Sequence, residues 1–188
     1  MYKELRKTYT AKIEQFKKIL LKQRFAQTIP LQAEYAQTTE WVGFKDRQKL
    51  NYIPINEGQA WGDAWDSAWF HLSATIPTEW SGKAVVARVQ VNGEILVFDT
   101  NGVPIYALTN ASAWDSAFVK DRYQITSCAA GGESIDLWME AACNGLFGIE
   151  RDEDPAADTP NRHGKFNGLA HDLKLSIWNQ DVQDLLLD

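Results

Sequence analysis

The sequence has little cysteine and no long hydrophobic run. Only two cysteines, Cys128 and Cys143, occur in 188 residues, too few for the disulfide framework of a small secreted domain. We expect both to be buried, reduced thiols. No apolar stretch approaches the ~20 residues of a membrane-spanning helix, and the N-terminus lacks the apolar segment of a secretory signal. We therefore expect a cytoplasmic protein without a membrane partner.

Catalytic motifs are also missing. The sequence contains no GxSxG, P-loop, GxGxxG, CxxC or HExxH motif, so it offers no local signature of a nucleophile, a phosphate loop or a metal site. Asp63 and Asp66 are expected to cap a turn rather than to act as a catalytic pair. The acidic stretch RDEDPAADT lacks the spacing of a calcium-binding EF-hand. We predict no catalytic residue and no metal site, and we expect His71, His163 and His171 to be surface histidines or histidines with satisfied hydrogen bonds rather than metal ligands.

Charge is distributed unevenly along the chain. Residues 1–24 contain eight Lys or Arg and two Glu, whereas the remainder contains eleven Lys or Arg and twenty-three Asp or Glu. A basic arm on an acidic body can indicate binding to nucleic acid or to a membrane. This arm lacks interleaved aromatic residues in a groove-like pattern, and the acidic body would repel phosphates. We favour a solvated helix that docks on an acidic surface, with no nucleic-acid partner.

The first part of the chain predicts a helix followed by irregular structure. Apolar residues recur every three or four positions over residues 3–26, which is typical of an amphipathic helix; they are Leu5, Tyr9, Ile13, Phe16 and Leu20. From Thr28 to Asn56 no period is sustained. We interpret that segment as an extended connector, with Trp41 as a possible anchor.

From Tyr52 the pattern changes to short strands separated by turns. The stretch FHLSATIP alternates, with Phe70 on the core side and Trp69 on the opposite face. Asn92-Gly93 between two β-rich runs predicts a type I′ hairpin, and further strands are expected at 117–125, 134–142 and 169–178. This predicts a mainly β protein, an antiparallel jelly-roll-type sandwich preceded by an amphipathic helix. We divide the chain into 1–51 (helix and connector), 52–178 (sandwich) and 179–188 (start of a helix).

Four of the eight tryptophans lie between residues 61 and 80. Trp61, Trp65 and Trp69 are spaced as on one helical face, but Gly62 and the strand that begins at Trp69 favour the edge of a sandwich. Exposed tryptophan rings can stack on the apolar faces of sugars. Trp61 and Trp65 are therefore the candidate sugar-stacking residues.

The sequence from Gly58 to Pro104 resembles the N-terminal β-sandwich of the α-mannosidases of glycoside hydrolase family 38, in the bacterial and fungal-vacuolar branch. Later, ACNGLFG, ending at Gly148, resembles the family's Ala-x-Asn-Gly-x-Phe-Gly. More loosely, the sandwich is similar to galactose-binding-type domains of other glycosidases. The first match rests on Gly58, Trp61-Gly62, Trp69-Phe70, Ile76-Pro77, Glu79-Trp80, Gly93-Glu94, Asp99, Gly102 and Pro104.

The resemblance implies a non-catalytic N-terminal domain, a fragment of a retaining enzyme that hydrolyses terminal α-linked mannose. The family's metal-binding and nucleophile positions have no counterpart in this sequence. A divalent metal such as zinc would belong to a catalytic domain of the same polypeptide, and residues 179–188 would begin the helical linker to it. Two alternatives remain open: a carbohydrate-binding module that uses exposed tryptophans, and a module for oligomerisation or another interaction.

Overall fold

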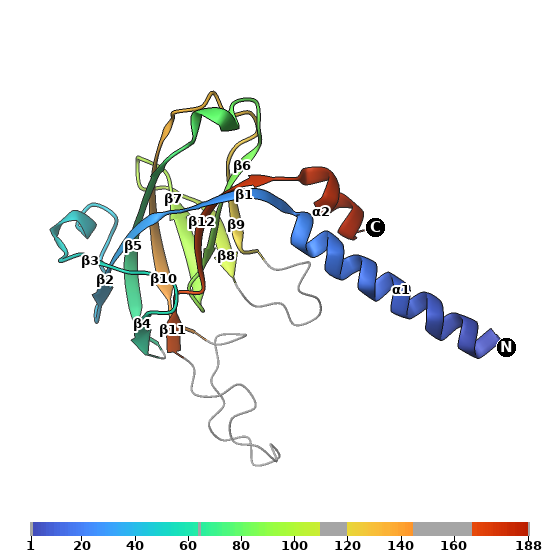
Figure 1. The fold of residues 1–188 in the computed structure, drawn as a ribbon. Helices are drawn as coiled ribbons and strands as arrows, with labels where there is room; N and C mark the ends of the chain where they lie inside the picture. Colours follow the sequence, from blue (N-terminus) through green and yellow to red (C-terminus); the bar gives the residue numbers. More distant parts are fainter. Residues whose placement is uncertain (1, 64, 110–119, 145–166, 188) are drawn as a thin grey trace, which may run out of the picture.

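The computed structural model describes residues 2–63, 65–109, 120–144 and 167–187. A long helix, α1 (Tyr2–Gln23), leads into two facing β-sheets, and a short helix, α2 (Gln180–Leu187), ends the described chain (Figure 1). One sheet has the strand order β1-β12-β6-β9 and the other β3-β2-β5-β10-β7-β8, while β11 and β4 form a separate pair. The strands are β1 (Phe25–Pro30), β2 (Gln32–Thr38), β3 (Ile53–Pro54), β4 (Ala60–Asp63), β5 (Ser67–Thr75), β6 (Val85–Gln90), β7 (Glu94–Phe98), β8 (Pro104–Thr109), β9 (Arg122–Thr126), β10 (Ser134–Ala142), β11 (Asn167–Leu169) and β12 (Asp172–Trp178).

Neighbouring strands are antiparallel throughout the described sheets. The inner faces of the sheets supply a single apolar core, because alternate residues of each strand point inward. The predicted fold class, a mainly β antiparallel sandwich preceded by a helix, is thus confirmed. Fully buried members of this core include Trp61, Phe70, Leu72, Trp80, Val85, Val97, Met139 and Leu175.

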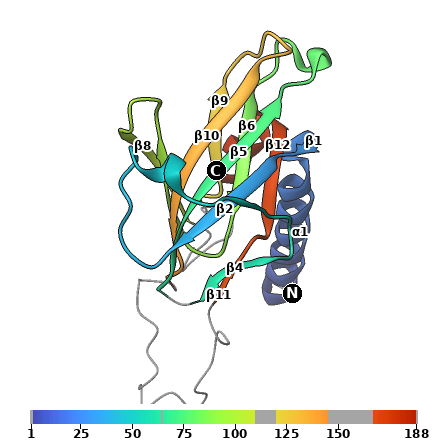
Figure 2. The ribbon, with the colours of Figure 1, turned by 90° about the vertical axis from the view of Figure 1, so that its left-hand side faces the viewer.

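The expected connector is partly wrong, since its first half forms strands. β1 pairs with β12 in the four-stranded sheet, and β2 pairs with β5 in the six-stranded sheet. Figure 2 shows the chain passing from one to the other without a loop between them. Leu31, between the two strands, is buried and donates its N–H to the Leu173 carbonyl. Because the segment changes sheets in its middle, its burial follows no single period.

The hairpin predicted at Asn92-Gly93 is also wrong. β6 and β7, which flank this turn, lie in different sheets, so the turn carries the chain across the sandwich. Asn92 has a φ of 58°, and its side-chain amide donates to the Asn167 carbonyl at 2.6 Å. Gly93 lies so close to Ala142 that a Cβ would be 2.3 Å from the Ala142 carbonyl oxygen. The glycine is needed for this close approach, not for a positive φ in a type I′ turn.

The strand from Ser67 to Thr75 has the two faces that the alternation predicts. Phe70 faces the core, where its ring meets those of Trp61 and Tyr35. Trp69 points to the outer face of the six-stranded sheet, yet it is also buried, at 1% exposure. The segment between β2 and β3, which includes the short helix η1 (Arg47–Lys49), covers it.

The N-terminal helix is confirmed and ends at Gln23, three residues before the predicted end. Its C-terminal end reaches the body: Leu20 is buried, and so is Arg24, the residue directly after the helix, which donates to Gln183 of α2. The rest of α1 extends away from the sandwich (Figure 1). Neither helix of the described chain is both long and apolar enough to cross a lipid bilayer.

Candidate functional site

Trp61 is a core residue rather than an open platform. Its ring is 1% exposed, packs edge-on against Phe70 and donates its indole N–H to the Val91 carbonyl at 2.7 Å. Gly168 in β11 fits against the other side, where a Cβ would lie 2.3 Å from the ring. A ring enclosed in this way presents no face to a sugar.

Trp65 lies in the turn between β4 and β5, with its side chain 63% exposed. Its backbone has a φ of 73°, which is rare for a bulky residue, and its N–H donates to the Cys143 carbonyl at 2.7 Å. Asp66 holds the same turn: its carboxylate accepts bonds from the Asp63 N–H at 2.7 Å and the Gln37 amide at 2.6 Å. The expected role of Asp66 in capping this turn agrees with these contacts. Asp63 itself is exposed.

A second group of side chains lies on the outer face of the six-stranded sheet, under the segment from Thr39 to Tyr52. Phe44 packs on Trp69 and Phe98, and the guanidinium of Arg47 lies 3.5 Å from the centre of the Phe44 ring. The indole N–H of Trp69 donates to the Val42 carbonyl at 2.8 Å. Trp41, the expected anchor, is instead 84% exposed. Phe44 and Arg47 hold the segment in place.

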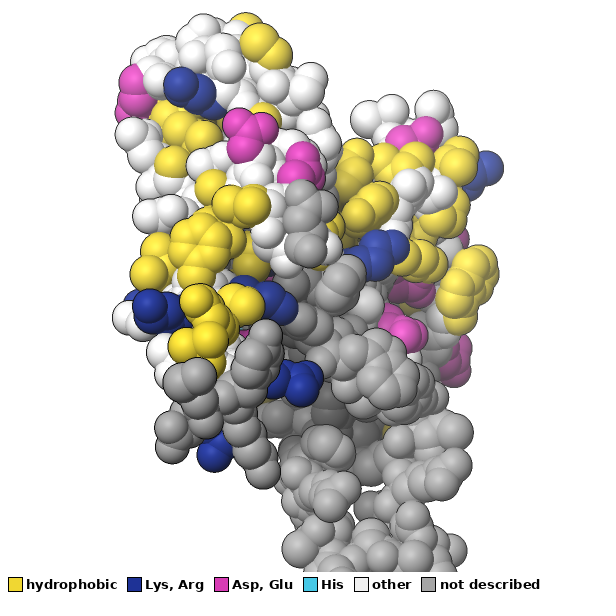
Figure 3. All heavy atoms as spheres, turned by 90° about the vertical axis from the view of Figure 1, so that its right-hand side faces the viewer, with side chains coloured by type: hydrophobic (Ala, Val, Ile, Leu, Met, Phe, Trp, Pro, Cys, Tyr) yellow, Lys and Arg dark blue, Asp and Glu magenta, His cyan; other side chains and the backbone are white. Residues whose placement is uncertain are grey.

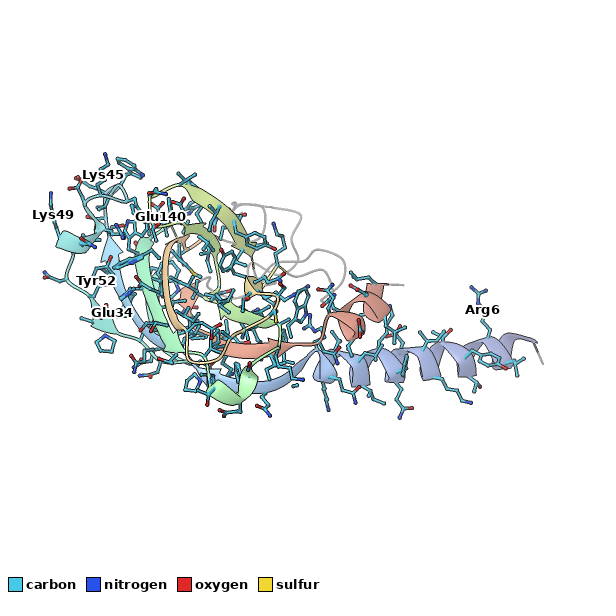
Figure 4. All side chains as sticks on the ribbon, turned by 90° about the horizontal axis from the view of Figure 1, so that it is seen from above. Arg6, Glu34, Lys45, Lys49, Tyr52 and Glu140 are labelled. Carbon is cyan, nitrogen blue, oxygen red and sulfur yellow. The ribbon has the colours of Figure 1, made fainter. Side chains whose placement is uncertain are left out.

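Beside Arg47, His71 lies flat on Trp138, with ring centroids 4.2 Å apart and planes at 11°. Its Nδ1 is 2.8 Å from a Glu34 oxygen, and its Nε2 is 2.6 Å from an Asp136 oxygen. These residues come from β2, β5 and β10, at the end of the molecule away from α1 (Figure 4, where Glu34 is labelled). Both ring nitrogens are occupied, so His71 ties three strands together and has no lone pair open to a metal ion or substrate.

Burial displaces the pKa values of Tyr52 and Glu140 on this face. Burial raises the pKa of the Tyr52 hydroxyl to about 12, and this hydroxyl donates to the Arg47 carbonyl at 3.1 Å. Burial likewise raises the pKa of Glu140, which lies between Trp69 and Leu96 on neighbouring strands. A raised pKa at one isolated carboxyl does not make the two-carboxylate arrangement of a glycosidase.

The raised pKa of Glu140 predicts a pH-dependent effect on stability. Its folded-state pKa exceeds the unfolded value, so ionising it costs stability as pH rises through the folded pKa. We expect Glu140→Gln to stabilise the protein at pH 7, by less than about 1 kcal/mol because solvent screens a half-buried carboxylate, with no gain below the unfolded pKa. Urea unfolding across this pH range measures it. Glu79→Gln, at an exposed position, is the matched control, and an equal gain in both variants would contradict the explanation.

The remaining candidate side chains form no site. Within the described ranges, no three His, Cys, Asp or Glu residues are placed to hold a metal ion. His171 is exposed, and His163 and the stretch RDEDPAADT lie outside the described residues. Cys143 is buried, as expected, but Cys128 is exposed, so the expectation that both thiols are buried is wrong for one of the two.

The sequence matches the family described as "Alpha-mannosidase, jelly roll domain" over residues 28–169. This match covers most of the described sandwich. The chain belongs to this family. The resemblance and the jelly-roll fold inferred from the sequence are both confirmed.

Curated relatives of this jelly roll domain are α-mannosidases. Alpha-mannosidase 2C1 of Mus musculus is 29% identical over 151 residues, which cover 80% of this chain and 14% of the mouse protein. Alpha-mannosidase G of Dictyostelium discoideum is 28% identical over 113 residues, covering 60% of this chain and 10% of that protein. The chain therefore spans about one-seventh or less of the length of these relatives.

Among solved structures, a Faecalibacterium prausnitzii β-glucuronidase shares the fold. It superposes with a TM-score of 0.51 at 15% identity, covering 81% of this chain and 31% of the β-glucuronidase chain. At this identity the likeness concerns the fold alone. It shows the same jelly-roll architecture within a larger glycosidase.

Sequence reasoning missed the residues of the outer-face group. Alternation along SIDLWMEAA places Asp136, Trp138 and Glu140 on one face, and this signal was available. Nothing local indicates that Arg47, in an irregular segment, would lie 4.2 Å from the Trp138 ring centre. The structure places Arg47 against Trp138 on the outer face of the six-stranded sheet. It places Trp61 in the core and leaves Trp65 exposed.

Proposed function

We propose that this jelly roll domain gives structural support to the catalytic domain of an α-mannosidase that hydrolyses terminal α-linked mannose. The observation that carries the proposal is the family match over residues 28–169, on a chain whose relatives named above are α-mannosidases several times longer. The catalytic domain of the same polypeptide is then its principal partner.

The contacts around the candidate residues favour support over chemistry. His71 is hydrogen-bonded to both Glu34 and Asp136, and the guanidinium of Arg47 lies against the rings of Phe44 and Trp138. With Trp61 in the core, only Trp65 of the two candidate sugar-stacking residues is exposed. A carbohydrate-binding role is therefore not the function we propose.

Two further features belong to this proposal. A divalent metal such as zinc would be held by the catalytic domain, because the described residues of this chain do not fit one. The exposed, unpaired thiol of Cys128 is compatible with a reducing compartment, and we propose a cytoplasmic location. Neither a membrane nor nucleic acid is proposed as a partner.

The proposal predicts that this chain alone does not turn over an aryl α-mannoside, with or without added zinc. The purified chain, shown to be folded by circular dichroism, would be assayed beside an intact α-mannosidase as the positive control. Release of the aryl group above the buffer rate by the folded chain would contradict a supporting role. Turnover that disappears after a further purification step would instead identify a contaminant.

A further inference from the structure

Three arginines lie together on the outer face of the four-stranded sheet, and we call Arg24, Arg88 and Arg122 the arginine patch. Arg24 directly follows α1, while Arg88 and Arg122 are opposite each other on β6 and β9. The guanidinium groups of Arg24 and Arg88 lie 5.3 and 4.2 Å from the centre of the Phe25 ring. That of Arg122 lies 5.2 Å from the ring of Trp178, the residue opposite Phe25 in the sheet. Figure 3 views the molecule from the side that carries the helices and shows Lys and Arg side chains set among hydrophobic ones.

Arg88 has a carboxylate partner of its own. It forms an ion pair with Asp172, whose other oxygen lies 3.2 Å from the Lys174 ammonium. The charge of Lys174 is in turn balanced by Glu57, at 2.9 Å. These two cations and two carboxylates therefore carry no net charge, and they leave nothing over for the rest of the arginine patch.

The other two arginines share one carboxylate, that of Asp121. Its Oδ1 lies 3.4 Å from Nη1 of Arg122, whereas Arg24 forms no ion pair with any carboxylate of the described residues. Arg24 is also the most deeply buried of the three, at 9% exposure. Burial lowers the pKa of Arg24, an effect that Asp121 opposes and the other two arginines increase. Because a buried charge is costly unless it is paired, the patch is one negative charge short.

Buried hydrogen-bond donors without acceptors accompany this excess charge. Among the described residues, no partner is present for the Nε atoms of Arg24 and Arg88, the indole Nε1 of Trp178 or the amide Nε2 of Gln183. Gln183 is 2% exposed, and its amide oxygen lies 3.4 Å from Nη1 of Arg24, which places its free N–H groups beside that guanidinium. Trp178 is held close to the same residue, since the next N–H along the chain, of Asn179, donates to the Arg24 carbonyl at 2.9 Å. Buried polar groups are nearly always hydrogen-bonded, so these four donors call for an acceptor.

We propose that the arginine patch is a binding site for a carboxylate, whose single negative charge balances Arg24 and whose two oxygens accept bonds from the unpartnered donors. The planar fork of a guanidinium matches the two oxygens of a carboxylate. The side chains of Arg88 and Arg122 are 22% and 19% exposed, so the patch is open to solvent on their side. The carboxylate can belong to an acidic side chain of a longer polypeptide or to a free ligand. Only the first source rests on the proposed support role, and the site itself does not.

Acetate is the probe for this site, and the readout is the indole N–H signal of Trp178 in nitrogen-15 NMR spectra of the whole 188-residue chain. Acetate replaces chloride at constant ionic strength, so that general screening does not change during the titration. The signal, identified by its loss in Trp178→Phe, should shift and reach saturation below roughly 0.1 M acetate. Trp69 and Trp80 are internal references that should not move, because their indoles already donate to Val42 and Gln27.

Substitutions of Arg24 test whether the unbalanced charge is what binds acetate. Arg24→Gln should weaken acetate binding by at least about tenfold, and Arg24→Lys, which keeps the charge, should retain part of the affinity. Arg6→Gln is the matched control, since it removes the same charge from the outer end of α1 (Figure 4) and should leave the titration unchanged. Reference indole signals at their original positions verify that each variant is folded.

A Trp178 signal that does not move with acetate, or a response that survives Arg24→Gln, would overturn the proposal. Phosphate is the comparison probe, and saturation at a concentration roughly tenfold lower than that of acetate would overturn the assignment to a carboxylate.

The source of the carboxylate is tested in an α-mannosidase polypeptide that contains this domain, with fluorotryptophan in place of tryptophan so that Trp178 can be followed in a large protein. If Trp178 responds to acetate in the 188-residue chain but not in the longer polypeptide, an acidic side chain of that polypeptide occupies the patch. If it responds equally in both, the patch binds a free carboxylate. Either result supports the site, and the first also supports contact with the rest of the polypeptide.

Discussion

Replacing Trp61 with alanine is expected to lower the free energy of unfolding by about 3–5 kcal/mol. The side chain is 1% exposed, fills the space between Phe70 and Gly168, and satisfies the Val91 carbonyl. Alanine leaves a cavity as well as a buried acceptor without its donor, and these costs add. Urea unfolding followed by far-ultraviolet circular dichroism measures the change.

Trp41→Ala is the matched control for that experiment. The residue type and the substitution are the same, but Trp41 is 84% exposed, so we expect a change within about 0.5 kcal/mol. Equal losses in the two variants would contradict the buried position of Trp61. They would also reopen its candidacy as a sugar-stacking residue.

Gly93→Ala is the second substitution expected to be severe, at about 2–4 kcal/mol. The new Cβ would lie 2.3 Å from the Ala142 carbonyl oxygen, which belongs to a paired strand and cannot rotate away as a side chain could. Alanine would therefore force the turn away from the end of β10. Thermal and urea unfolding both report the loss.

Gly82→Ala controls for the general cost of replacing a glycine. Gly82 has a φ of +76° and no neighbour within 4 Å of its added Cβ, so only backbone strain applies, about 1–2 kcal/mol. The two substitutions thus separate a steric clash from left-handed strain. If Gly93→Ala costs no more than Gly82→Ala, the close approach between the turn and β10 is not rigid.

The strands that lie within a single sheet were the easiest to predict. SIDLWMEAA alternates strictly, and its predicted limits are those of β10. β5 was also anticipated, including the opposite directions of Trp69 and Phe70. In both strands each face has a constant environment along its length, so the alternation of residue types in the sequence indicates which side chains face the core.

Segments that pass between sheets could not be predicted in this way. Asn92-Gly93 has the local chemistry of a hairpin, but β6 pairs with β12 and β7 pairs with β10 rather than with each other. Those partners are distant in sequence, and nothing in the turn specifies them. The change of sheet at Leu31 could not be predicted for the same reason, since β1 pairs with β12 and β2 pairs with β5, both distant in the sequence.

The candidate site shows the same limit. Trp61 and Trp65 lie four residues apart in similar surroundings in the sequence, yet one is enclosed and the other open. The difference is set by Phe70, Val91 and Gly168, two of which are far along the chain from Trp61. Residue type identified aromatic candidates, whereas tertiary contacts decided which ring is exposed.

The pairing of β1 with β12 brings the two ends of the sandwich together, with Phe25 opposite Trp178. The family match ends at residue 169, before β12, although β12 is the strand that joins β1 to β6. A version of the domain cut to the matched residues would therefore split its four-stranded sheet and expose a core edge. Conversely, the adjacent ends suit circular permutation: joining them through a short linker and opening the chain at the Asp99–Gly102 turn would retain every strand pair.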